Sequence, residues 1–310
     1  MSNLLNFIRL LRSRKDQFTV VIPASAYDGE GVRYLSDLLA TIRMQTIQSR
    51  IIIIDHSIDF ALSDFIRDLS QSNIFYFRNR LYRGNWCVNV NFGLHLANIA
   101  GSKYIKIMFQ DDVLIDSLAF EKISRAFQRS PEKGWVCHSS SHFLDPEEFI
   151  ELVGGRALGV MDEDRIVIPE FNMNRLMRME NQISCPSAVT FKHGVKVFFD
   201  RNLILGGDCE FYLQLFKKTG SPILLSIPLT SNREHNSSVT QMIRRGSLKS
   251  RKRFIDGRKV RNRKDLLIWE ILYMERKYSS SLHWLKIFPM RIILITKTAW
   301  KALNKWKLTF

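Results

Sequence analysis

Two adjacent carboxylates, Asp111 and Asp112, directly follow an apolar stretch with the character of a buried strand. Such strands lie inside α/β sheets, and ligands of open α/β sheets bind beyond the carboxyl ends of the strands. We therefore expect both side chains at the mouth of a cleft. Carboxylate oxygens suit Mg2+ or Mn2+, which commonly bind one or two carboxylates together with substrate phosphates. The pattern indicates a metal-bound diphosphate, unless Asp112 and Asp116 only start the next helix, as aspartate often does.

Segments of strand and helix character alternate from residue 18 to residue 138 at the spacing of βαβ units. Strands are expected at residues 18–22, 50–54, 74–77, 104–109, 135–138, 187–191 and 223–227, and helices at 117–129 and 209–219. The sequence thus predicts an α/β fold with a mostly parallel central sheet and helices on both faces. No G-x-G-x-x-G motif follows the first strand, which excludes a dinucleotide-binding Rossmann fingerprint.

The composition restricts the class of protein and of partner. A chain of 310 residues with 45% hydrophobic and 25% charged residues can hold one large domain and an appendage. Its formal net charge of +16 predicts an anionic partner, which could be nucleic acid, an acidic membrane surface or a phosphorylated substrate. The four cysteines are far apart without a C-x-x-C pair, so we expect reduced thiols of a cytoplasmic protein.

Three regions are expected along the chain. Residues 1–16 form an amphipathic segment without the features of a signal peptide, residues 17–240 form the main domain, and residues 241–310 form a basic helical extension. No apolar run is long enough for a transmembrane helix. Beyond Pro289, apolar and lysine residues occupy opposite faces of an expected helix. That helix either lies in a membrane interface or packs on the main domain.

Several short motifs occur in a recognisable order. They are FTVVIP at 18–23, IIIIDHSID at 51–59, YIKIMFQDD at 104–112, CPSAVTFK at 185–192, GGD at 206–208 and EHNSSVT at 234–240. In this order they resemble the motifs of the family 2 glycosyltransferases, which have the GT-A fold, over about residues 17–240. The resemblance implies a non-processive enzyme that transfers a sugar from a nucleotide-diphosphate donor to an acceptor hydroxyl, by a single displacement with inversion.

The resemblance also implies a donor side. Pro23 ends the opening strand, and Asp55 takes the place of the aspartate that contacts the nucleotide base, although an Asx turn would equally explain an aspartate there. Asp111 is implied as the ligand of Mn2+ or Mg2+, with Asp112 supporting it or binding the ribose. His235 is implied to reach the metal or the diphosphate; imidazole suits Mn2+ better than Mg2+, and the alternative is a bystander in a loop.

Asp208 takes the place of the family's general base. Its alternative is a helix N-cap, a position that aspartate favours, and the two roles are compatible. Ser187 and Glu210 are implied on the acceptor side. Phe109 and Gly207 stand where the commonest family motifs have acidic residues, which keeps an inactive relic as a further alternative.

The basic extension would hold the enzyme on an anionic membrane, near a lipid-linked or polysaccharide acceptor of cell-envelope glycan synthesis. The expected location is cytoplasmic and peripheral, on the inner face of the membrane, with no nucleic acid as partner. Two other readings stay open. The basic cluster at 244–264 could track nucleic-acid phosphates, or the chain could be a nucleotidyltransferase of related fold.

Overall fold

The computed structural model describes residues 3–13, 16–26, 29–69, 71–79, 86–144, 152–153, 156–157, 166–235, 254–255, 258–259 and 263–278. The chain divides into two compact units. The first comprises Met1–Phe171, Gln182–Phe199 and Gln214–Glu234, and the second comprises Asn172–Asn181, Asp200–Leu213 and His235–Phe310. The boundary passes through helix α7 (Gly207–Thr219), so each unit includes part of that helix.

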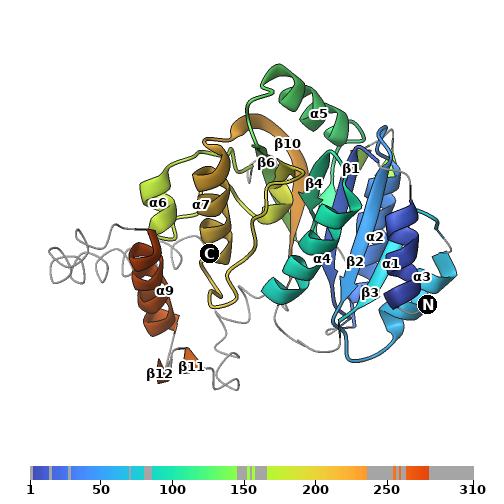
Figure 1. Ribbon diagram of the computed structural model, residues 1–310, viewed down its shortest axis with the longest axis horizontal. Helices are drawn as coiled ribbons and strands as arrows, with labels where there is room; N and C mark the ends of the chain where they lie inside the picture. Colours follow the sequence, from blue (N-terminus) through green and yellow to red (C-terminus); the bar gives the residue numbers. More distant parts are fainter. Residues whose placement is uncertain are drawn as a thin grey trace, which may run out of the picture. The chain divides into compact units, whose positions relative to one another are not determined.

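The first unit is built on one eight-stranded sheet in the order β3–β2–β1–β4–β9–β6–β10–β5 (Figure 1). Half of the sheet is parallel throughout, and it consists of β3 (Ile74–Arg78), β2 (Ser49–Asp55), β1 (Phe18–Ala24) and β4 (Tyr104–Ile107). The carboxyl ends of these strands therefore meet at one edge of the sheet. Ligands of open α/β sheets bind beyond such an edge.

The other half of the sheet mixes strand directions. β9 (Val189–Lys192) is antiparallel to β4 and to β6 (Trp135–Leu144), while β10 (Ile223–Glu234) is parallel to β6. The short β5 (Val113–Leu114) pairs antiparallel with Thr230 and Ser231 of β10. Because β5 begins directly after Asp112, this pairing brings the late strand β10 to the predicted carboxylates.

The central strands are apolar on both faces because helices cover both. Val20 and Ile53 belong to a core that they share with α2 (Gly31–Arg43), α3 (Ala61–Leu69) and α5 (Ala119–Arg129). On the opposite face, α4 (Trp86–Ala100) packs on β1 and β2. Gly93 permits this close approach, since a Cβ there would lie 2.4 Å from Val21 Cγ1.

Helix α1 (Asn3–Arg12) covers the edge strand β3 (Figure 1). Asn3 Nδ2 donates to the Arg78 carbonyl at 3.0 Å, and its Oδ1 accepts from the Arg78 amide at 3.0 Å. Asn6 Nδ2 donates to the Tyr76 carbonyl at 2.7 Å. These side-chain amides satisfy edge-strand groups that would otherwise be available to pair with another chain.

The described part of the second unit is mainly helical. α6 (Met173–Met177) packs on α9 (Arg263–Tyr278), and Leu176, Ile271 and Met274 are buried. β11 (Phe254–Ile255) and β12 (Arg258–Lys259) form a short antiparallel pair. In the first unit, β7 (Leu152–Val153) and β8 (Arg156–Ala157) form another.

The predicted α/β fold with its mostly parallel sheet is confirmed, but several bounds differ. The strand expected at 104–109 ends at Ile107 because a turn follows. Residues 187–188 belong to a 3-10 turn (Pro186–Ala188), so that strand starts at Val189. The helix expected at 209–219 starts at Gly207, which places Asp208 inside its first turn and not at its N-cap.

The division expected at residue 240 lies near the start of the last segment of the second unit. That unit also includes residues 172–181 and 200–213, which it groups with α9. Most of the 244–264 cluster and the helix expected beyond Pro289 lie outside the described residues. Within the described residues, no helix combines the length and the apolar character that crossing a membrane requires.

Candidate active site

The turn that carries Asp111 is fixed by two other segments. Asp112 N donates to the Phe109 carbonyl at 3.1 Å and closes the turn. Phe109 N donates to Ser187 Oγ at 2.9 Å. The Gln110 amide pairs with the Ser25 backbone, accepting from its N at 2.5 Å and donating to its carbonyl at 2.8 Å. The turn is therefore held by the residue that follows β1 and by the 3-10 turn that precedes β9.

Asp112 is buried, and both its oxygens contact other side chains. Asn232 Nδ2 donates to Oδ1 at 3.0 Å, and Cys185 Sγ lies 3.5 Å from Oδ2. Burial, followed by the charge of Asp111, raises the pKa of Asp112 to about 7, against the opposing effect of these hydrogen bonds. Asp112 thus does not start the next helix. Asp116 does take part in that helix start, because its Oδ1 accepts from Leu118 N at 2.8 Å.

The backbone of Asp111 is held by a buried arginine. Arg233 Nε donates to the Asp111 carbonyl at 3.2 Å, and Arg233 Nη2 donates to Asp37 Oδ2 at 2.6 Å. The guanidinium lies over the rings of Tyr34 and Phe143, at 4.5 and 5.1 Å from their centroids. The Asp111 side chain itself is only half-buried. It is therefore the more accessible of the two carboxylates.

A fully buried lysine lies behind this turn. Lys106 Nζ donates to the Ser187 carbonyl at 2.5 Å and lies 3.2 Å from His138 Nε2. Burial lowers the pKa of Lys106 to about 7, although nearby acidic groups including Asp112 favour its charged form. The same Ser187 accepts from Phe109, so Lys106 helps to hold the segment that supports the turn.

Asp55 lies at the carboxyl end of β2 on the same sheet edge. It is fully buried: Ser57 N donates to Oδ1 at 2.7 Å, and the Tyr76 hydroxyl donates to Oδ2. Ser57 Oγ also contacts Oδ1 and accepts from Ala26 N at 2.8 Å. The Asx-type contact considered from the sequence is thus present. Direct contact of Asp55 with a nucleotide base would require these bonds to open.

The carboxylates fit a metal that is shared with a substrate. Asp111 offers hard oxygens at a fixed turn, whereas both oxygens of Asp112 already accept or contact donors. Among the described residues, no group of three or more His, Cys, Asp and Glu side chains could hold a metal. A divalent ion would therefore take most of its remaining ligands from phosphates and water, which is the usual way in which Mg2+ binds.

The predicted catalytic residue belongs to the second unit. Asp208 is half-buried in the first turn of α7, and Glu210 in the same turn is fully buried. Glu210 Oε1 accepts from Lys277 Nζ at 2.6 Å and from the Tyr278 hydroxyl at 2.7 Å. His235 follows β10 as a half-buried residue and is the first residue of that unit's last segment.

Ser187 and Glu210 are the two residues predicted for the acceptor side. Both are fully buried, and their polar groups contact the protein itself. Pro23 is also buried, within β1. Sequence reasoning missed Asn232, Arg233 and Cys185. It also missed Lys106, although this residue has a visible signal in the sequence, namely a charge inside an otherwise apolar strand.

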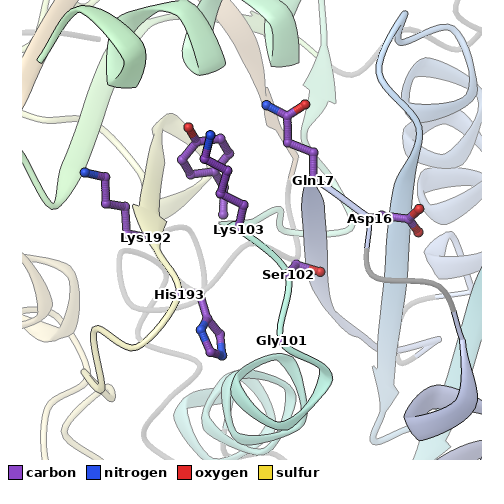
Figure 2. A pocket seen from close by; sticks show the side chains of 8 residues that line it. Asp16, Gln17, Gly101, Ser102, Lys103, Lys192 and His193 are labelled. Atoms are coloured by element: carbon purple, nitrogen blue, oxygen red, sulfur yellow. The ribbon is translucent and has the colours of Figure 1, made fainter. Parts of the chain in front are cut away.

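A surface pocket of about 600 Å³ lies elsewhere on the first unit (Figure 2). Asp16 and Gln17 precede β1, Ser102 and Lys103 precede β4, and His193 follows β9. These positions are at the amino ends of β1 and β4. The pocket is thus at the sheet edge opposite to Asp111.

No protein-family model matches the chain, and no curated protein does. Among solved structures, a mannosyltransferase from Pyrobaculum calidifontis in complex with GDP-Man and Mn2+ matches with a TM-score of 0.50 and 14% identity, covering 98% of this chain and 95% of that one. S. aureus TarS matches with a TM-score of 0.48 and 13% identity, over 86% of this chain and 45% of that one. TarS residues 1–349 in complex with UDP-GlcNAc match with a TM-score of 0.48, 14% identity, and coverage of 85% and 73%. The mannosyltransferase match confirms the predicted GT-A fold.

Proposed function

We propose that the protein is a glycosyltransferase that moves a sugar from a nucleotide-diphosphate donor to an acceptor hydroxyl. The observation that carries the proposal is the fixed turn at the carboxyl end of β4. There Asp111 is pinned through its carbonyl by Arg233, and its neighbours Phe109 and Gln110 are pinned by Ser187 and Ser25. The mannosyltransferase of the same fold, which is in complex with GDP-Man and Mn2+, supports this assignment.

Asp111 would hold a divalent ion together with the donor diphosphate. Asp112 would support the turn through its buried contacts with Asn232 and Cys185. When bound, Mn2+ or Mg2+ would neutralise the charge that develops on the departing nucleoside diphosphate. The proposed role of Asp55 is to keep Ser57 and the β2 end in place on the donor side. A contribution of His235 to the metal or the diphosphate remains part of the proposal.

Asp208 is proposed as the general base. Its carboxylate would take the proton of the acceptor hydroxyl while that oxygen forms a bond to the anomeric carbon and the bond to the diphosphate oxygen breaks, which inverts the configuration. A negative charge in the first turn of a helix interacts favourably with the helix dipole, so this position suits a carboxylate.

The acceptor is proposed to be a glycan or lipid-linked molecule at an anionic membrane surface, on its cytoplasmic side. α1 supports this peripheral association because its asparagines face β3 while Leu4, Leu5 and Leu11 are 66%, 53% and 52% exposed. α1 has no acidic residue, its Arg12 is exposed, and the whole chain carries a net charge of +16. Apolar side chains with basic neighbours are typical of helices that bind anionic membrane interfaces.

Donor binding is the direct test. We expect one of UDP, GDP, CDP and dTDP to raise the melting temperature of the full-length protein in the presence of Mn2+, and EDTA to abolish the shift. Asp111→Ala should lose the shift, whereas Asp116→Ala, which removes a carboxylate of the following helix start, should keep it. If no nucleotide stabilises the protein in the presence of Mn2+ or of Mg2+, the proposed function is wrong.

A further inference from the structure

A buried carboxylate of α9 binds the loop that leads into α7. Glu270 accepts from three successive backbone amides: Ile204 N at 2.6 Å, Leu205 N at 2.9 Å and Gly206 N at 2.7 Å. Glu270 is fully buried. Each of its oxygens is thus used to fix the backbone just before Asp208.

These amides directly precede α7, and Gly206 is at its N-cap position. Glu210 N donates to the Gly206 carbonyl at 2.9 Å, so Gly206 provides the first helical acceptor and Asp208 follows two residues later. Amides at a helix start have no partner within the helix, and a negative charge there interacts favourably with the helix dipole. Glu270 supplies both the acceptor and the charge from a helix that is distant in sequence.

The same face of α9 also holds both ends of this segment. Tyr273 and Lys277 donate to Asp200 at 2.6 and 2.7 Å, before the loop. Lys277 and Tyr278 donate to Glu210 at 2.6 and 2.7 Å, after it. The amides that donate to Glu270, at residues 204–206, lie between Asp200 and Glu210 along the chain. The path from Asp200 to Glu210, which contains Asp208, is therefore fixed at three places by one helix.

A buried carboxylate that is held by neutral backbone amides is costly. Burial raises the pKa of Glu270 to about 7, and the three amide bonds only partly oppose this effect. An apolar residue would join the two helices without that cost. What the carboxylate adds is a defined backbone geometry for residues 204–206, because several charge-assisted hydrogen bonds fix position and direction together.

We propose that Glu270 is a positioning residue for Asp208: it fixes the backbone of residues 204–206 so that the first turn of α7 presents the Asp208 carboxylate in one orientation. The proposal rests on the assignment of Asp208 as the general base. It makes α9 a working part of the enzyme.

The experiment compares Glu270→Gln with Asp200→Asn in the full-length protein. Both replace a carboxylate with its amide, and both affect contacts between α9 and the loop, but only the first faces the amides of residues 204–206. Nucleoside diphosphate release from UDP-GlcNAc and from GDP-mannose with Mn2+ gives kcat and KM. Hydrogen exchange of residues 203–208 reports the loop without reference to activity.

For Glu270→Gln we expect about tenfold faster exchange in that segment and a kcat lower by about 10- to 100-fold with KM for the donor unchanged. Asp200→Asn should lower kcat much less than Glu270→Gln does, because Asp200 fixes only the start of the segment, eight residues before Asp208. Equal losses of kcat in the two variants would indicate general docking of α9 and would overturn the proposal, as would unchanged exchange in Glu270→Gln.

An error in the base assignment and an error in the positioning role would give different results. If Asp208→Asn turns over normally, the base assignment is wrong and the positioning role falls with it. If Asp208→Asn is inactive while Glu270→Gln has the wild-type kcat, the base assignment stands and only the positioning role is wrong. A wild-type protein that releases no nucleoside diphosphate from either donor would contradict both.

Discussion

Arg233 Nη2 donates to Asp37 Oδ2 at 2.6 Å, and neither side chain is exposed. The pair joins β10 to α2, and Nε of the same arginine donates to the Asp111 carbonyl. A buried ion pair contributes little net stability because both charges lose their hydration. Its effect here is to fix the register of the late strand against the turn that carries the proposed metal ligand.

Removal of one partner should be much worse than removal of both. Arg233→Met leaves the Asp37 carboxylate buried without its cation, so we expect the free energy of unfolding to fall by about 3–5 kcal/mol. The double variant Asp37→Leu, Arg233→Met should recover much of that loss. Urea unfolding of the two variants and the wild type measures this. A double variant as unstable as Arg233→Met would contradict the interpretation.

Asp208→Asn should leave donor binding intact and lower turnover. A well-placed general base typically contributes about 10²- to 10⁴-fold, and the asparagine side chain cannot accept the acceptor proton. The measurement is kcat for donor turnover beside the nucleotide-induced shift in melting temperature. Glu180→Gln is a suitable control, because this acidic residue of the second unit pairs with Arg175 at the surface. Normal turnover in Asp208→Asn would rule out its role as the base.

The fold could be predicted because its strands can be recognised from short stretches of sequence. Residues 20–22 and 51–54 are apolar without interruption, which is expected only of strands covered on both faces, and apolar residues at helical spacing lie between them. Bounds were less predictable where a turn competes with the strand. Phe109 looks like a strand residue, but its carbonyl accepts from Asp112 and closes the turn.

The site was predictable only where chemistry is concentrated in one segment. Asp111 and Asp112 stand out as two charges after an apolar run. Arg233 and Glu270 do not, because their partners are far away in the sequence and only tertiary structure brings them together. Glu210 illustrates the same limit: its place in a motif predicts a position on the acceptor side, but its contacts with Lys277 and Tyr278 could not be read from the sequence.

Lys106 should make stability depend on pH. Its folded-state pKa of about 7 is below the value of about 10.5 in the unfolded chain, so the folded protein binds fewer protons between these values. The Lys106 contribution to the free energy of unfolding should therefore rise as pH increases from 7 to 10.5. Urea unfolding of the wild type and of Lys106→Met at about pH 7 and at about pH 9.5, both within this range, tests the prediction. The wild type should gain stability relative to the variant, and a constant difference would contradict the prediction.

The exposed leucines of α1 should determine binding to an anionic membrane surface. In Leu4→Ser, Leu11→Ser the inward contacts of Asn3 and Asn6 remain, so we expect the fold to be unchanged while vesicle binding falls severalfold through the loss of buried apolar area. Sedimentation with phosphatidylglycerol vesicles measures the effect. Ile168→Ser, which changes another exposed apolar residue of the same unit, should bind like the wild type. Equal losses in both variants would mean that α1 is not the membrane-binding face.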